Sequence, residues 1–164
     1  MSKELYNKTY FLNSRKFQMS RTKKLSVFRK IMELKPERVL DVGCGLGTLV
    51  KWLREEGIKA WGVDFAKTLK DDFGMEEDYF VITDAKKLPF EDNFFDVVVS
   101  TDFFEHLLKE EIDIVLGEMK RVGGKVLVKV AYKAPLNLRQ MKLHQTNKPK
   151  SWWKKKLKGV ILCD

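Results

Sequence analysis

Residues 39–47 read Val-Leu-Asp-Val-Gly-Cys-Gly-Leu-Gly, an apolar strand that ends near Asp41 and continues into glycines at every second position. Each of these glycines lacks a Cβ and tolerates positive φ, so the backbone can turn sharply and lie directly against a ligand. A dinucleotide-binding loop needs glycine or alanine where this chain has Thr48, because the following helix must pack tightly against the strand. The loop therefore indicates an adenosyl cofactor and argues against a dinucleotide.

Strands and helices are predicted to alternate along the chain. Apolar runs predict strands at 38–42, 59–64, 78–83, 94–100, 125–131 and 160–162. Apolar residues at helical spacing predict helices at 20–34, 48–56, 66–73, 110–121 and 151–158. The predicted connections are an irregular arm at 1–13, a turn at Gly123-Gly124 and a loop at 132–148. This alternation is typical of an α/β fold with a doubly wound, mostly parallel sheet and right-handed crossovers.

The 164 residues are predicted to form a single domain. It divides into an N-terminal arm and helix at 1–36, a cofactor-binding core at 37–131 and a basic C-terminal segment at 132–164. Hydrophobic residues make up 44% of the chain, which excludes a disordered protein. No apolar run reaches the roughly 20 residues that a membrane-spanning helix needs.

The cysteines and the first residues point to a cytoplasmic protein. Cys44 and Cys163 suggest neither a disulfide framework nor the spacing of a metal site, so no metal is expected. The opening sequence MSKELYNKTY lacks the apolar core of a signal peptide.

Four motifs follow one another at the ends of predicted strands, in the order LDVGCGLG, WGVDF, ITDAKKLPF and FFDVVVSTDFFEHL. In this order they closely resemble the class I S-adenosylmethionine-dependent methyltransferases. The resemblance spans about residues 37–130, with a weaker echo at HQTNKPKSWWKKKLKG. It implies a Rossmann-like fold, S-adenosylmethionine as cofactor and methyl transfer as the activity. The Glu-His pair in the fourth motif resembles the small-molecule branch, so a small or medium acceptor is expected.

The resemblance also implies which residues bind the cofactor. Asp41 and the loop glycines would face its methionyl part, and Asp64 would accept hydrogen bonds from both ribose hydroxyls. Asp84 and the backbone N–H of Ala85 would hold the adenine. The complete predicted set is Asp41, Gly43, Cys44, Gly45, Gly47, Asp64, Phe65, Asp84, Ala85 and Thr101.

Each of the aspartates has a structural alternative. Asp41 could cap the following turn, Asp64 could begin the next helix, and Asp84 could form an Asx turn before Pro89. An NAD-dependent oxidoreductase also stays open, because Asp64 has the spacing of a ribose-binding carboxylate. A module that binds the cofactor without catalysis is a further alternative.

Candidate residues for binding or activating the methyl acceptor follow the fourth predicted strand or lie near the C-terminus. His106 titrates near neutrality, so it is the candidate general base for an acceptor that carries a proton. Its alternative is a structural hydrogen bond with Glu105. His144 and one ring of Trp152-Trp153 are candidates for acceptor recognition, although tryptophans at this spacing are more typical of a core.

Basic residues gather at both ends of the chain, whereas residues 39–116 are acidic, and the net charge is +9. The basic ends could offer one positive surface to an anionic partner, which includes RNA as a methyl acceptor. The structural alternative is a charged surface adapted to high temperature.

The last predicted strand, 160–162, lies where the family would continue into an antiparallel hairpin, so a truncated C-terminal hairpin is expected. An unpaired apolar edge strand is a liability. We therefore expect this strand to pair beside the fifth strand or with a second copy of the protein, which would give a homodimer.

Overall fold

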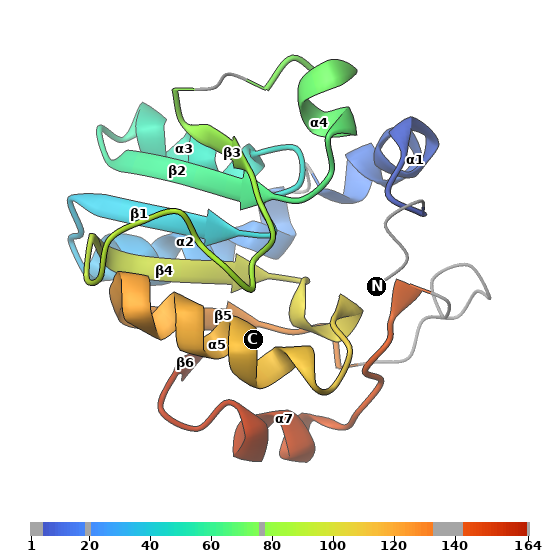
Figure 1. Cartoon of the computed structure of the whole chain (residues 1–164). Coiled ribbons are helices and arrows are strands. Elements are labelled where there is room, and N and C mark those ends of the chain that lie inside the picture. The colour runs from blue at the N-terminus through green and yellow to red at the C-terminus, as the bar shows by residue number, and fades with distance from the viewer. Residues whose placement is uncertain (1–4, 19–20, 76–77, 133–142, 164) are drawn as a thin grey trace.

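The computed structural model describes residues 5–18, 21–75, 78–132 and 143–163, and a six-stranded sheet forms its centre (Figure 1). The strands are β1 (Arg38–Val42), β2 (Lys59–Asp64), β3 (Phe80–Ile82), β4 (Phe95–Thr101), β5 (Gly123–Lys129) and β6 (Ile161–Leu162). They lie in the order β3-β2-β1-β4-β5-β6, and every pairing between them is parallel. The chain winds outward from β1 in both directions, which places a topological switch point beside the end of β1.

Helices cover both faces of the sheet. They are α1 (Lys8–Gln18), α2 (Arg21–Glu33), α3 (Thr48–Glu55), α4 (Thr68–Asp71), the 3-10 turn η2 (Phe104–His106), α5 (Glu111–Val122) and α7 (Lys150–Lys156). In Figure 1, α5 lies in front of the sheet and α2 and α3 lie behind it. This layering buries the central strands on both faces, which explains the unbroken apolar run of β4. None of the described helices is long and apolar enough to cross a membrane.

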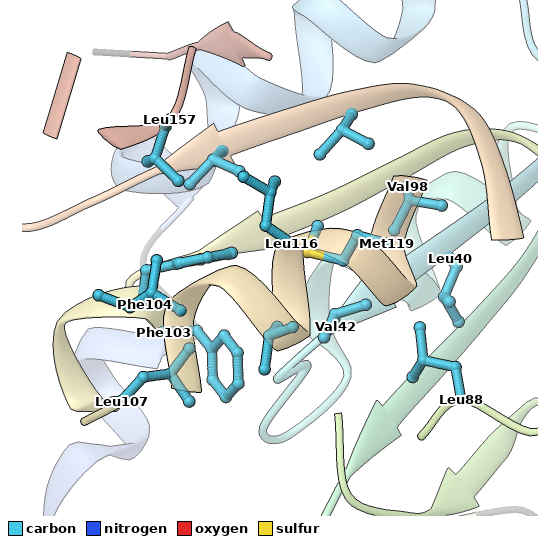
Figure 2. Close-up of a cluster of buried hydrophobic side chains, with 14 of the residues drawn as sticks. Leu40, Val42, Leu88, Val98, Phe103, Phe104, Leu107, Leu116, Met119 and Leu157 are labelled. Carbon is cyan, nitrogen blue, oxygen red and sulfur yellow. The ribbon is translucent and has the colours of Figure 1, made fainter. Parts of the chain in front are cut away.

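A buried apolar cluster fills the space between the sheet and α5. It includes Met119 of α5 and Leu157, which follows α7. Figure 2 shows Phe103, Phe104 and Leu107 together at one end of this cluster. These three residues follow β4 directly, so the core extends to the carboxyl end of the sheet, where ligands bind in folds of this type.

Residues 8–13 belong to a helix, whereas the whole of 1–13 was predicted to be an irregular arm. Helix α1 begins at Lys8, and the side chain of Asn7 accepts a hydrogen bond from the Tyr10 N–H at 3.1 Å, as an N-cap does. Phe11 is 2% exposed and packs edge to face on Phe73, with ring centroids 6.0 Å apart. Local periodicity does not reveal α1, because tertiary packing stabilises this short polar helix.

Gly123 and Gly124 begin β5 instead of forming the predicted turn. Gly123 follows α5 without a connecting loop, has an extended backbone (φ −144°, ψ 148°) and pairs with Phe95. A Cβ on Gly123 would overlap the side chain of Val98. The glycine therefore allows β5 to start close against β4, a role that glycine can have without any turn.

The other elements lie near their predicted positions, and β1 and β2 have the predicted bounds. Strand β6 pairs with β5, with Ile161 opposite Leu127 and Leu162 opposite Val128. This confirms one of the two placements expected for the last strand. The homodimer and the truncated hairpin stay predictions, and most of the predicted loop at 132–148 lies outside the described residues.

Candidate functional site

The glycine loop connects β1 to α3 at the carboxyl edge of the sheet. Gly43, Gly45 and Gly47 have φ values of 73°, 54° and 66°, which confirms the positive φ expected of them. The first two amides of the loop donate to the carbonyl of Val63 on β2, at 2.9 and 3.1 Å. A Cβ at Gly43 would overlap the ring of Phe103. The loop is therefore held against β2 and touches the segment that follows β4.

Asp64 ends β2 beside this loop, and backbone amides hold its carboxylate. Oδ2 accepts a hydrogen bond from the Gly45 N–H, and Oδ1 accepts one from the Ala66 N–H, both at 3.1 Å. Burial raises the pKa of Asp64, while the amide hydrogen bonds oppose the rise. These amides fix the orientation of the carboxylate but leave lone pairs on both oxygens, so it can still accept hydrogen bonds from a diol.

A cavity lies at this edge of the sheet and holds about 520 Å³ of empty space, the open space at its mouth included. Phe103 and Leu107 contribute apolar surface to its lining. Five of the predicted cofactor-binding residues also line it: Gly43, Asp64, Phe65, Asp84 and Ala85. The motifs at the ends of β1, β2 and β3 therefore meet around one cavity, at the edge of the sheet where ligands bind in folds of this type.

Asp84 lines the cavity and also forms the Asx turn that was its structural alternative. Its Oδ1 accepts a hydrogen bond from the Lys86 N–H at 3.0 Å. The Nζ atom of Lys86 lies 2.6 Å from Glu111 Oε1 and 3.7 Å from Asp84 Oδ2. Lys86 and Glu111 belong to the cavity lining, and the sequence analysis missed both. No motif or local spacing connects a residue after β3 with one at the start of α5.

Asp41 is deeply buried and does not line the cavity. Its side chain is 1% exposed, and neither carboxylate oxygen has a hydrogen-bond partner in the described part of the chain. Burial raises the pKa of Asp41 to about 6, although the charge of Lys24 opposes the rise. Unpartnered buried carboxylate oxygens are costly in the free protein. They are the kind of group that a cationic ligand satisfies.

The remaining predicted cofactor residues do not line the cavity: Cys44, Gly45 and Gly47 belong to the loop, and Thr101 lies at the end of β4. Gly47 is the N-cap residue of α3. Cys44 is buried, and a Cβ at Gly62 of β2 would lie only 2.7 Å from its Sγ, so the glycine makes room for this thiol. Thr101 ends β4, and its buried hydroxyl has no hydrogen-bond partner among the described residues.

Glu105, His106 and His144 form a second group of ionisable side chains beyond the end of β4. The two imidazoles pack edge to face with ring centroids 4.8 Å apart. Burial and the neighbouring His144 lower the pKa of His106 to about 4. Burial and the charge of Asp102 raise the pKa of Glu105 to about 8. At neutral pH this group therefore combines an uncharged imidazole with a largely protonated carboxyl group.

The imidazole of His106 contacts the backbone at Leu143 and at Asp102. Its Nδ1 lies 3.1 Å from the carbonyl of Leu143, to which it donates in the tautomer that is protonated at Nδ1. Glu105 Oε1 accepts from the Ala131 N–H at 3.3 Å, and Oε2 has no partner among the described residues. The hydrogen bond between Glu105 and His106, considered above as a structural alternative, is not formed.

Tyr6 lies between the cavity and the histidines. Its ring packs edge to face on Phe65, which lines the cavity, at 5.1 Å between centroids, and on His106 at 6.0 Å. Tyr6 is absent from the predicted site because none of the four motifs includes it. The N-terminal segment therefore contributes an aromatic side chain to the site.

Comparison with known proteins gives matches to methyltransferases. The family model of the methyltransferase domain matches residues 40–128. The ubiquinone biosynthesis O-methyltransferase of Nitrosococcus oceani is 28% identical over 120 residues, which cover 68% of this chain and 51% of that protein. The demethylmenaquinone methyltransferase of Thermus thermophilus is 33% identical over 108 residues, covering 59% and 48%. The chain thus spans about half the length of these curated relatives.

Solved structures extend the similarity beyond the matched segment. A SAM dependent methyltransferase from Archaeoglobus fulgidus superposes with a TM-score of 0.73 at 26% sequence identity. The superposition covers 90% of this chain and 72% of that one. The similarity therefore includes most of the sheet and helices as well as the segment that carries the motifs.

Proposed function

Since this chain belongs to the methyltransferase domain family, as a class I S-adenosylmethionine-dependent member with a Rossmann-like sheet, we propose that it transfers the methyl group of this cofactor to a small or medium acceptor. The observation that carries the proposal is the Asp64 carboxylate, which the amides of Gly45 and Ala66 hold at the wall of the cavity. A carboxylate held in this way offers two oxygens to the vicinal hydroxyls of a ribose.

The residues around the cavity fit the chemical groups of S-adenosylmethionine. Asp41 does not line the cavity, but its unpartnered carboxylate suits the ammonium group of the methionyl part. The glycine loop brings backbone close to the ligand, because a Cβ at Gly43 has no room. Asp84 and Ala85 line the same cavity and suit the adenine. The NAD alternative is less favoured, since Thr48 replaces the small residue that its loop requires.

The cofactor supplies a methyl group on a positively charged sulfur, and the acceptor displaces that sulfur in line. The protein's part is to align the two reactants and to keep water away from them. Phe103 and Leu107 present apolar surface to the cavity, and Tyr6 packs between the cavity residue Phe65 and His106. The role of His106 as a base stays a prediction.

The proposed class of methyl acceptor is supported by the names of related enzymes. The names of two relatives describe methylation in ubiquinone biosynthesis and of demethylmenaquinone, and a small or medium acceptor agrees with them. A cytoplasmic location is part of the same proposal. It is supported by Cys44 and Cys163, which are buried and form no disulfide with each other.

Ligand binding to the purified protein tests the proposal. Calorimetry and thermal unfolding are measured with S-adenosylmethionine, with its demethylated product and with NAD. We expect the first two to bind and to raise the melting temperature, and NAD to do neither. Binding of NAD alone, or failure of the folded protein to bind either sulfur compound, would overturn the proposal.

The acceptor is then sought with a labelled methyl group. The protein is incubated with methyl-labelled S-adenosylmethionine and fractionated cell extract, and label is expected in the small-molecule fraction. Label in RNA would support the alternative acceptor class. Binding without transfer to any fraction would favour the non-catalytic module.

A further inference from the structure

The three side chains beyond β4 include the donor types of a metal site. Glu105 and His106 belong to η2, whereas His144 comes from the segment before α7. One donor atom from each residue lies within 4.8 Å of the other two. No spacing in the sequence marks this set, because His144 is remote along the chain, and the expectation of no metal rests only on the two cysteines.

Two donor atoms in this group lack hydrogen-bond partners. Glu105 is 1% exposed, and its Oε2 has no partner within the described residues. The Nδ1 atom of His144 is also buried without a partner there. A buried carboxylate oxygen and a buried ring nitrogen that face no protein partner are costly to keep. A bound ligand between them would remove that cost.

Backbone contacts hold these donors in place independently of any ligand. The Thr146 N–H donates to the carbonyl of Glu105 at 3.1 Å, and the Thr146 hydroxyl donates to the carbonyl of Leu107 at 2.8 Å. The Nδ1 atom of His106 lies 3.1 Å from the Leu143 carbonyl and donates to it when this nitrogen carries the proton. Histidines that bind metals usually donate their second ring nitrogen in this way, which orients the ring and fixes the tautomer. The segment that carries His144 is therefore tied to η2 on both sides of that residue.

We propose that Glu105, His106 and His144 bind a first-row divalent cation, with Zn²⁺ as the type ion. Two imidazoles and one carboxylate are an established donor set for such ions, and three protein ligands leave coordination positions for other oxygens. Donors on a common Zn²⁺ lie about 3.3 Å apart, since each bond is about 2.0–2.2 Å long. Binding therefore draws the present donor atoms together by at most about 1.5 Å.

The cation gives the site a means of activating a hydroxyl acceptor. A hydroxyl group bound at an open position loses its proton to solvent more readily, because the cation stabilises the oxygen anion. The oxygen then forms a bond to the methyl carbon while the bond from carbon to sulfur breaks. In this arrangement His106 is a ligand, which replaces the role of base predicted from the sequence. This role in methyl transfer rests on the proposed function, whereas the cation site itself does not.

Metal titration of the chelator-treated protein tests the inference. Zn²⁺ is titrated by calorimetry, and Co²⁺ is followed by its visible absorption. We expect one ion per chain in the wild type and in the control Glu110→Gln, whose carboxylate is exposed nearby. We expect His144→Ala and Glu105→Gln to bind at least about tenfold more weakly. His144 lies in an irregular, partly exposed segment, so its replacement by alanine should leave the fold intact.

Each outcome shows whether Glu105, His106 and His144 bind a metal ion. Absence of saturable binding by the folded wild type, or unchanged affinity in folded His144→Ala, would overturn the inference. Thiolate absorption of the Co²⁺ form would assign the ion to Cys44 or Cys163 and would also overturn it. Binding of S-adenosylmethionine is measured on the same samples without metal. Metal binding without cofactor binding would contradict the proposed function and leave the cation site standing.

Discussion

Two buried carboxylates, those of Asp41 and Glu105, and the half-buried carboxylate of Asp64 lower the stability of the free protein but can bind a ligand. Asp41, Asp64 and Glu105 all lie at or just beyond the carboxyl ends of strands, and burial raises the pKa of each. Asp64 recovers part of this cost through two backbone amides, whereas Asp41 has no partner among the described residues. Replacing each of these two aspartates should therefore have a different effect on stability and on ligand binding.

Asp64→Ala should weaken the binding of S-adenosylmethionine by about 1.5–3 kcal/mol, the range for a hydrogen bond to a charged group. Calorimetry measures the loss. Asp113→Ala is the matched control, because its carboxylate is exposed on α5 and pairs only with Lys156 among the described residues. Thermal unfolding of the free variants shows whether the released amides of Gly45 and Ala66 disturb the fold. Equal affinity of folded Asp64→Ala and the wild type would contradict the ribose assignment.

Asp41→Asn should stabilise the ligand-free protein at neutral pH while weakening cofactor binding. The pKa of Asp41 is about 6 in the folded state and about 3.9 in an unfolded chain. The folded state therefore binds the proton more tightly, so this contribution to stability is complete below about pH 4 and is lost as the pH rises through 6. The loss amounts to about 2–3 kcal/mol.

Urea unfolding of wild type and Asp41→Asn between pH 4 and 7 measures this effect. The stability of the variant relative to the wild type should increase across that window. Other groups that titrate in this pH range, including Glu105, contribute equally to the stability of both proteins, so their contributions cancel in the comparison. Identical pH dependence of the two proteins would show that Asp41 is not an uncompensated buried acid.

At the level of elements, the junction between α5 and β5 depends on one residue without a side chain. Gly123 faces the side chain of Val98, whereas a Cβ at Gly124 would meet only the Asp96 carbonyl oxygen at an ordinary 3.5 Å. The two positions are adjacent in the same strand, so they form a matched pair.

Gly123→Ala should destabilise the protein by about 1–3 kcal/mol, the usual cost of overpacking a core. Gly124→Ala should change stability far less. Replacing glycine by alanine also restricts the unfolded chain, which stabilises both variants alike. The difference between their free energies of unfolding therefore measures the overlap with Val98. Denaturant unfolding measures both, and equal stability of the two variants would contradict the packing role of Gly123.

Strand β6 bears on the predicted homodimer. It occupies the place beside β5 within the same chain, and in the described sheet no strand lies on its outer side. A dimer through that outer edge stays a prediction. Sedimentation at high protein concentration checks it, since a profile that stays monomeric would rule the dimer out.

Across the whole molecule, acidic residues of the middle partly neutralise the basic ends. Lys8 of α1 pairs with Asp72 at 2.8 Å, and Lys156 of α7 pairs with Asp113 at 2.6 Å. Figure 1 shows α1 and α7 at different margins of the molecule, which does not favour one continuous positive surface made by these two helices. The exposed lysines of α7 are therefore the basic residues on which we test an anionic partner.

If α7 contacts an anionic partner, affinity for single-stranded RNA should fall linearly with the logarithm of salt concentration. Lys154 and Lys155 are both exposed on this helix. Replacing both by alanine should reduce the slope by about 1.4, or about 0.7 for each phosphate contact. Lys59→Ala at the start of β2 is the control. Fluorescence anisotropy measures these affinities, and absence of a slope or of binding would show that the lysines only interact with solvent.

Much of the fold could be predicted because its signals are local. The bounds of β1 and β2 follow from apolar runs between turn residues, and the positive φ of the loop follows from glycine at 43, 45 and 47. Helix α1 and the start of β5 could not be predicted in this way. Phe11 stabilises α1 through contact with Phe73, and Gly123 adapts to Val98 on another strand.

The family, the parallel sheet and the edge where Asp64 and Asp84 meet all follow from local sequence signals, because parallel strands bring their carboxyl ends to one side whatever their exact packing. Only the tertiary structure decided that Tyr6 and His144 join His106. These contacts join segments that are remote along the chain, and they depend on how each segment packs against the sheet. The burial of individual carboxylates also depends on tertiary packing. The surroundings of a side chain, and not its type, leave Asp41 and Glu105 with unpartnered oxygens among the described residues.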